Sequence, residues 1–351
     1  MIVATRNYAR FLPEALDSAL GQSVPPREVV VVDDDSEDDT PSVLRRYGSE
    51  IRAIRQEHGG QGAAWNRGFL ETSGEWIAFL DADDGWAPER VRRCLEAAGP
   101  EVGVVMHDLE VVGEAAQHPS WVGWTAVDIR QGRIGEELVR GGLPWVFTPT
   151  SGFMIRRRVL ERILPLEARR WPVSADAPVL HLAAQLTAIR YLPERLGFYR
   201  VHGANFSNHQ GWYDGNDRPK LILDNLWRLQ RTAFEVNRHL AGTGSRDRVC
   251  LWNNPYYARM IGWVAGRSAL THGTDLLRRQ GALGRFLGRG MRTELYRIRE
   301  GMSHHRQRSA SLGDRIREMA RQDFPDLDLE NVWEPSLRTP SAPPPTRSGR
   351  A

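Results

Sequence analysis

The run from Val29 to Val32 constrains the fold of this chain more than any other stretch. Four consecutive valines have no polar face, so they favour a strand buried on both sides, as in a parallel sheet covered by helices. The run ends in the polar turn Asp33-Asp34-Asp35-Ser36. We therefore expect the chain to begin with a covered, mostly parallel sheet.

Strand-like and helix-like segments alternate through the first part of the chain. Strands are predicted over residues 2–4, 29–32, 51–54, 76–80 and 102–106, and helices open near Pro13, Pro41, Ala63 and Pro88. This alternation indicates right-handed β-α-β crossovers. The predicted fold class is α/β, Rossmann-like, with a mostly parallel central sheet and helices on both faces.

Past residue 145 the pattern changes to α+β. A strand and helix are expected over 153–160, a helix over 179–186, and a closing pair of strands over 189–192 and 196–201. Helical spacing returns from residue 212, and the end of the chain is rich in Pro, Ser and Arg. These shifts predict one domain over 1–208, a helical C-terminal region over 209–334 and a disordered tail over 335–351.

A second apolar strand, Trp76 to Leu80, ends in Asp81-Ala82-Asp83-Asp84. A buried strand does not need acids at its end, whereas a loop that holds Mg²⁺ or Mn²⁺ does, since these ions take oxygen ligands. The alternative is that aspartate is simply common in turns after strands.

Polar side chains follow three of the predicted strands: Thr5 and Asn7, then Asp33 and Asp34, then the acids after Leu80. In parallel sheets ligands bind beyond the carboxyl ends of the strands. We therefore expect these side chains to form one site, with Asp33 ordering its own loop.

Composition and charge argue against several other classes of protein. The net charge is only +3, basic and acidic residues are interleaved, and Lys220 is the only lysine, so no nucleic-acid surface is expected. No apolar run approaches the roughly 18 residues that span a bilayer. No signal peptide is recognised, and Cys94 and Cys250 lack metal-type spacing, so a cytoplasmic setting is expected. The mixed apolar and basic stretch 283–289 leaves open a weak peripheral membrane contact, with a solvated bundle cap as the alternative.

Several ordered motifs carry a resemblance to a known family. They are Thr5-Arg6-Asn7-Tyr8-Ala9-Arg10-Phe11-Leu12, Val31-Val32-Asp33-Asp34-Asp35-Ser36, Gly60-Gln61-Gly62-Ala63-Ala64-Trp65-Asn66, Asp81-Ala82-Asp83-Asp84, Pro149-Thr150-Ser151-Gly152 and Tyr199-Arg200-Val201-His202-Gly203-Ala204-Asn205. With these motifs, residues 1–208 resemble a bacterial family 2 glycosyltransferase with the GT-A fold.

The resemblance implies a nucleoside diphosphate sugar as donor and a divalent cation, Mn²⁺ or Mg²⁺, as cofactor. Asp83 would be the main metal ligand, supported by Asp81 and Asp84. The donor would be bound by residues from several of the motifs, with Arg200 and His202 facing the diphosphate: Thr5, Asn7, Asp34, Gly62, Asn66, Asp81, Arg200 and His202. The alternative for His202 is a strand-end histidine that is satisfied within the fold.

On the acceptor side the resemblance implies Asp176 as general base, with Ser151 and Gly152 shaping the cleft. The acceptor would be a saccharide, a lipid-linked molecule or another hydroxyl compound. One base and one leaving diphosphate suit transfer with inversion. Asp176 could instead be a helix N-cap, and a tight turn would also need Ser151 and Gly152.

Three other functions compete with sugar transfer. A nucleotidyltransferase could also use carboxylate-bound metal, but it would normally have a basic Gly-rich loop after the first strand, and Arg6-Asn7-Tyr8 is not one. A catalytically inactive relative would bind the nucleotide sugar without transfer. A nucleic-acid binder would bind with steep salt dependence.

Overall fold

The computed structural model describes residues 1–118, 120–203, 205, 218–254, 256, 257 and 260. Within these residues one sheet contains the strands β1 (Ile2–Thr5), β2 (Val30–Asp34), β3 (Arg52–Gln56), β4 (Trp76–Asp81), β5 (Gly85–Trp86), β6 (Val102–Gly113), β7 (Phe153–Arg156) and β8 (Ala188–Val201). The α-helices are α1 (Leu12–Leu20), α2 (Thr40–Arg46), α3 (Gly60–Leu70), α4 (Arg90–Ala97), α5 (Trp121–Thr125), α6 (Gly135–Arg140), α7 (Arg157–Leu160), α8 (Asp176–Leu186) and α10 (Arg218–Gly242). Short 3₁₀ turns are η1 (Gly48–Glu50), η2 (Thr150–Gly152), η3 (Ala168–Arg170) and η4 (Leu251–Asn253).

The sheet has the strand order β3-β2-β1-β4-β7-β6-β8-β5. The first four strands in this order are parallel, as are β6 and β8, whereas β7 runs antiparallel to β4 and β6, and β5 antiparallel to β8. The predicted mostly parallel sheet is therefore confirmed. The chain winds from β1 outward to β3 and then returns to place β4 on the other side of β1. This reversal opens a crevice beyond the carboxyl end of β1, where ligands bind in such sheets.

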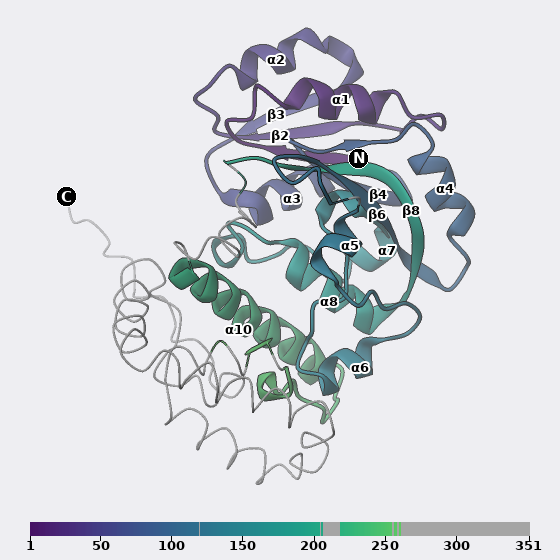
Figure 1. Cartoon of the computed structure of the whole chain (residues 1–351), viewed down its shortest axis with the longest axis vertical. Coiled ribbons are helices and arrows are strands. Elements are labelled where there is room, and N and C mark those ends of the chain that lie inside the picture. The colour runs from purple at the N-terminus through teal and green to yellow at the C-terminus, as the bar shows by residue number, and fades with distance from the viewer. Residues whose placement is uncertain (119, 204, 206–217, 255, 258–259, 261–351) are drawn as a thin grey trace, which may run out of the picture.

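Both faces of the sheet are buried, as the valine run of β2 requires. In β4, Ile77 and Phe79 pack on the face covered by α3, α6, α7 and α8, while Ala78 and Leu80 pack on the face covered by α1, α2 and α4. Figure 1 shows α1 and α2 on one side of the sheet and α3 and α8 on the other. Because strand side chains alternate between faces, an entirely apolar strand is stable only between two helical layers.

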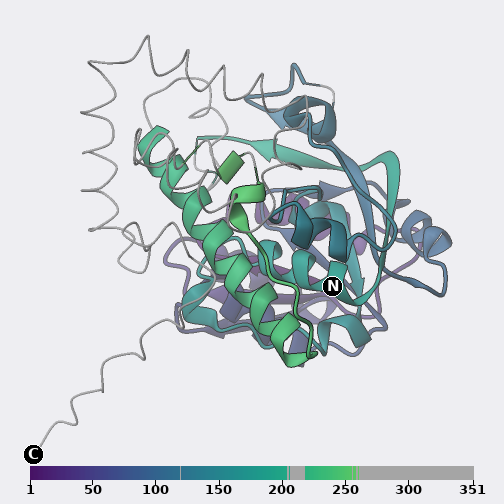
Figure 2. The same ribbon diagram turned by 90° about the horizontal axis from the view of Figure 1, so that it is seen from below.

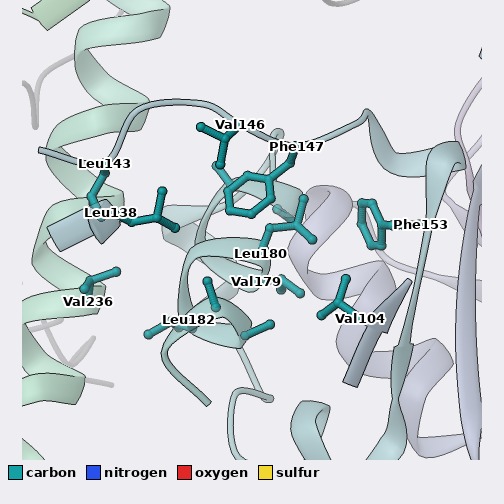
Figure 3. Close-up of a cluster of buried hydrophobic side chains, with 14 of the residues drawn as sticks. Val104, Leu138, Leu143, Val146, Phe147, Phe153, Val179, Leu180, Leu182 and Val236 are labelled. Carbon is teal, nitrogen blue, oxygen red and sulfur yellow. The ribbon is translucent and has the colours of Figure 1, made fainter. Parts of the chain in front are cut away.

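Helix α10 packs on the outside of α8 and joins the larger core. Its buried side chains Leu223, Leu226 and Val236 belong to the same cluster as residues of α6 and α8. Figure 3 shows Val236 facing Leu138 and Leu143, and Figure 2 shows α10 running across the helical layer. The first part of the predicted C-terminal region thus shares its core with the preceding residues. The boundary at 208 stays a prediction.

The predicted closing pair of strands is wrong, because residues 188–201 form the single strand β8. Pro193 and Glu194 suggested a break, but β8 pairs His107 with Leu192 and Asp108 with Arg195, so these two residues lie in a bulge. A bulge tolerates a proline, which has no N–H to donate to the ladder. Strand β6 likewise continues to Gly113 instead of ending near residue 107.

Several predicted features lie outside the described residues. These are the start of the helical run at 212–217, most of the helical spacing over 255–298, the stretch 283–289 and the tail from 335. Among the helices that are described, none combines the length and the apolar character needed to cross a bilayer.

Candidate active site

A cavity of about 520 Å³ opens at the reversal of strand order, within the roughly 300–1,000 Å³ typical of ligand pockets. Its lining includes the last residues of three strands, Thr5 of β1, Asp34 of β2 and Asp81 of β4, together with Asp83 after β4 and Asp176 at the start of α8. Five predicted site residues therefore meet in one place. The hydroxyl of Thr5 is buried and has no hydrogen-bond partner among the described residues, as expected of a group that meets a ligand.

Asp34 is held as a carboxylate by four donors. Its Oδ1 accepts from Gln56 Nε2 at 2.7 Å and the Gly59 N–H at 2.9 Å, while Oδ2 accepts the Gly60 N–H at 2.8 Å and lies 2.8 Å from His58 Nδ1. Burial acts to raise the pKa of Asp34, but these hydrogen bonds outweigh it and lower the pKa below its usual value. One end of the cavity is thus fixed as anionic.

The N-terminus of α3 holds the loop that leads to Asp176. Gln61 donates its N–H to Pro172 O, and Gly62 donates its N–H to Trp171 O, both at 2.8 Å. Gly60 has φ +79°, and a Cβ there would lie 2.4 Å from Pro172 Cα. Gly60 and Gln61 line the cavity, whereas Gly62 packs behind it. The glycines therefore shape the cavity wall through the backbone.

Gly60→Ala is expected to destabilise the fold and to displace the loop before Asp176. The left-handed backbone costs about 1–2 kcal/mol with a Cβ, and the contact with Pro172 adds about 1–3 kcal/mol of overpacking. Gly48→Ala is the matched control, since Gly48 has φ +51° and nothing lies within 4 Å of the position that its Cβ would take. Urea unfolding of both variants measures the difference. Equal losses of unfolding free energy would contradict the close packing of Gly60 on Pro172.

Asp84 builds the acidic turn and does not line the cavity. Only 1% exposed, it accepts the Ser151 hydroxyl at Oδ2 (2.7 Å) and the Arg200 N–H at Oδ1 (2.8 Å). Ser151 Oγ also accepts the N–H of Asp81 at 3.1 Å. Asp84 and Ser151 thus fix the turn in which Asp81 and Asp83 stand.

Asp83 is buried and is positioned by side chains after β8. Its Oδ2 accepts from Asn205 Nδ2 at 3.0 Å and lies 3.0 Å from His202 Nε2, while its carbonyl accepts from Arg200 Nε at 2.9 Å. Neither Arg200 nor His202 lines the cavity: Arg200 also pairs with Glu14, and His202 stacks on Phe11. In this structure both act on the acidic turn, and their predicted contact with the diphosphate stays a prediction.

The pKa of each of the acids Asp81, Asp83 and Asp84 is raised, mainly by burial. For Asp81 burial is the main cause, followed by repulsion from Asp83 and Asp176. For Asp84 it is burial, followed by repulsion from Asp83 and Asp81. For Asp83 burial again raises the pKa, and His202 and Arg200 partly offset it. Carboxylates that repel one another beside a cavity suit a bound cation.

The donor set fits a hard divalent cation. Asp81 and Asp83 supply the carboxylate oxygens that Mg²⁺ and Mn²⁺ prefer. Across the described part of the chain, no group of three or more His, Cys, Asp or Glu side chains could hold a metal ion. A cation here would therefore complete its coordination with oxygens from a bound ligand, as Mg²⁺ commonly does with phosphates.

Asp176 is the first residue of α8, and Ala175 occupies the N-cap position. The alternative that Asp176 is the N-cap is therefore wrong by one residue. Burial raises the pKa of Asp176, while Arg228 and the backbone amides of Asp176 and Ala177 act to lower it. The result is a carboxyl on the cavity wall with a pKa above its usual value, as a general base requires.

Arg228 on α10 completes the cavity wall and was not predicted. It lies beyond the motifs, in a helical region with no recognised pattern. Nothing in the mixed polar and apolar stretch 223–233 distinguishes Arg228 from Arg231, because many solvated helices contain such arginines.

The remaining predicted residues lie outside the cavity. Asn7 closes its loop by accepting the Glu37 N–H at Oδ1 (2.7 Å). Asn66 forms two hydrogen bonds of 2.8 Å to the backbone of Leu166. Gly152 has no room for a side chain, since a Cβ would lie 2.7 Å from Thr148 Oγ1. Their assignments to donor and acceptor stay predictions, while the structure gives each a role in folding.

A family model and a relative similar over most of this chain identify its family. The family model of glycosyl transferase family 2 matches residues 1–164. An uncharacterized glycosyltransferase of Nostoc sp. is 33% identical over 264 residues, which are 74% of this chain and 80% of that protein. The succinoglycan biosynthesis protein ExoO of Rhizobium meliloti is 40% identical over 116 residues, or 32% of this chain and 33% of that protein. Among solved structures, S. aureus TarS 1–349 has 18% identity and a TM-score of 0.48, with 92% of this chain and 90% of that chain covered.

Proposed function

We propose a reaction for this chain, which belongs to glycosyltransferase family 2 and is a glycosyltransferase. It would move a sugar from a nucleoside diphosphate sugar to an acceptor hydroxyl, with inversion at the anomeric carbon. The resemblance drawn from the motifs is confirmed, as is the α/β fold expected with it. The observation that carries the proposal is the meeting of Asp34, Asp81, Asp83 and Asp176 in one cavity.

The residues that line the cavity would have different roles. Asp34, held as an anion, would accept hydrogen bonds from the nucleoside, and the buried hydroxyl of Thr5 would also bond to it. Asp81 and Asp83 would hold a divalent cation together with the donor diphosphate. When bound, this cation would stabilise the charge that develops on the leaving diphosphate.

Asp176, on the cavity wall, would act as general base. Its carboxylate would take the proton of the acceptor hydroxyl as that oxygen attacks the anomeric carbon. Attack from the face opposite the diphosphate inverts the carbon, and a single base is sufficient. The repulsion between Asp176 and Asp81 indicates that this base stands near the acids of the turn.

Nucleotide binding with and without metal tests the proposal. Purified full-length chain is heated with UDP, GDP or dTDP, each with Mn²⁺ or with EDTA. One nucleoside diphosphate is expected to raise the melting temperature only with Mn²⁺, since a ligand at 100 times its Kd stabilises by about 2.7 kcal/mol. Stabilisation by none of them would overturn the proposal. Stabilisation without any transfer from the matching nucleotide sugars would favour the inactive relative.

The rate of transfer is expected to fall at acidic pH, at a higher pH than an exposed aspartate would give. Asp176 works only as a carboxylate, and burial raises its pKa above the usual value. The rate is therefore full above this raised pKa and is lost as the pH falls through it. Measuring kcat with saturating donor and Mn²⁺ from about pH 4 to pH 9 shows the acidic limb. A profile that stays flat to about pH 4 would contradict Asp176 as the base.

A further inference from the structure

We propose that Arg228 binds an anionic group of the acceptor, a phosphate or a carboxylate, close to the hydroxyl that is glycosylated. This inference rests on the proposed function and names the class of acceptor. It also gives a role to α10, which the family motifs do not reach.

Arg228 places a positively charged guanidinium on the cavity wall. It lines the cavity with Asp176 and is half-buried. Its guanidinium donates to Asn225 Oδ1 at 2.5 Å and lies 5.4 Å from the centre of the Trp145 ring. Burial lowers the pKa of Arg228, whereas the nearby carboxylates Asp176 and Asp224 act to raise it, and among the described residues neither forms an ion pair with it. Because arginine has five N–H donors in a planar fork, most of them stay available to a ligand anion.

The position of Arg228 favours the acceptor over the donor diphosphate. The acids that would hold the cation have their own basic neighbours, His202 and Arg200, from the end of β8. The cavity carboxylate that Arg228 influences is Asp176, whose pKa it lowers. An anion bound to Arg228 would therefore lie beside the proposed base, where the acceptor hydroxyl must also be.

The guanidinium of Arg228 could instead serve only to keep Asp176 ionised. The two roles differ in what they do to a neutral acceptor. A guanidinium that binds the acceptor anion is irrelevant to an uncharged acceptor, so loss of Arg228 changes KM for anionic acceptors alone. A guanidinium that acts only on the base would lower kcat for every acceptor.

The test compares Arg228→Gln and Arg228→Lys with the control Arg231→Gln in the full-length chain. Arg231 is on the same helix, donates to Arg170 O at 3.0 Å and lies 4.3 Å from the Trp227 ring centre, outside the cavity. The probes are glycerol, glycerol 1-phosphate and glycerate, titrated calorimetrically in the presence of Mn²⁺ and the nucleoside diphosphate that stabilises the chain. Comparison of the last two probes separates a phosphate from a carboxylate site.

We expect an anionic probe to bind the native chain and Arg231→Gln, and glycerol to bind both much more weakly. Arg228→Gln should weaken binding of the anionic probe by about tenfold or more, and Arg228→Lys by less, since lysine keeps the charge but not the fork. In transfer assays Arg228→Gln should lower kcat/KM for the anionic probe far more than for glycerol, because any effect on the ionisation of Asp176 falls on both acceptors equally.

Three results would overturn the inference: equal binding of neutral and anionic probes, an equal loss of binding in Arg231→Gln, or an equal loss of kcat/KM for glycerol and the anionic probe in Arg228→Gln. Its failure is distinguishable from failure of the proposed function. If Mn²⁺ and nucleotide still stabilise Arg228→Gln as they do the native chain, the donor site stands and only the acceptor class is wrong.

Discussion

Asp176→Asn is expected to abolish sugar transfer while donor binding stays close to that of the native chain. The amide keeps the shape of the side chain but cannot accept the acceptor proton, and loss of a general base costs about 10²–10⁴-fold in rate. Asp34 and Thr5, the proposed nucleotide contacts, are unchanged by the substitution. The measurements are kcat for transfer and the Kd of the donor with Mn²⁺.

The same substitution is expected to stabilise the fold at neutral pH. Because burial raises the pKa of Asp176 in the folded chain, its ionised form is disfavoured there relative to the unfolded chain. The loss of unfolding free energy caused by ionised Asp176 grows as the pH rises from its pKa in the unfolded chain to its pKa in the folded chain. Asparagine does not ionise and so removes this loss. Asp35→Asn is the control, since Asp35 is exposed and pairs with Arg55 at the surface. If Asp176→Asn lost donor binding while Asp35→Asn kept it, Asp176 would not be acting as the general base.

Asp83→Asn is expected to remove the dependence of nucleotide binding on Mn²⁺. A neutral amide is a poor replacement for a carboxylate ligand, and even partners one step removed from a metal cost about 10–100-fold in affinity when they are changed. Nucleotide affinity with Mn²⁺ should therefore fall to the level seen with EDTA. Titration of the nucleoside diphosphate in both conditions measures this.

Asp35→Asn serves again as the matched control, because it removes one charge from a neighbouring loop outside the cavity. Unchanged Mn²⁺ dependence in Asp83→Asn would show that the cation, if used, is held elsewhere. An equal loss of Mn²⁺ dependence in both variants would indicate a general effect of removing a negative charge. It would not support Asp83 as a metal ligand.

The features that could be predicted from sequence are those set by neighbouring residues. The valine run of β2 requires two covering layers whatever the rest of the chain does, and a strand followed at once by Asp81 and Asp83 places these acids at the carboxyl edge. The parallel direction of the first strands follows from the alternation of strands and helices. The meeting of Asp34, Asp81 and Asp83 was therefore within reach of sequence reasoning.

The features that were missed depend on contacts between distant parts of the chain. Residue type indicated that Asn66 and Arg200 could bind a ligand, but not that Leu166, Glu14 and the turn after β4 would occupy them. The length of β8 depends on a bulge against β6, which no local pattern records. Arg228 was missed for the same reason, since only the packing of α10 on α8 brings it to the cavity.

The placement of Arg228 also has a consequence for how such enzymes diversify. The proposed donor contacts lie at the ends of strands. The proposed acceptor contact lies on the separate helix α10, which packs on the core through Leu223, Leu226 and Val236. Substitutions elsewhere on α10 can therefore change the acceptor that is bound, while these three side chains keep the helix packed on the core. Chimeras that exchange this helix between homologues should inherit the acceptor preference of the helix and the nucleotide preference of the sheet.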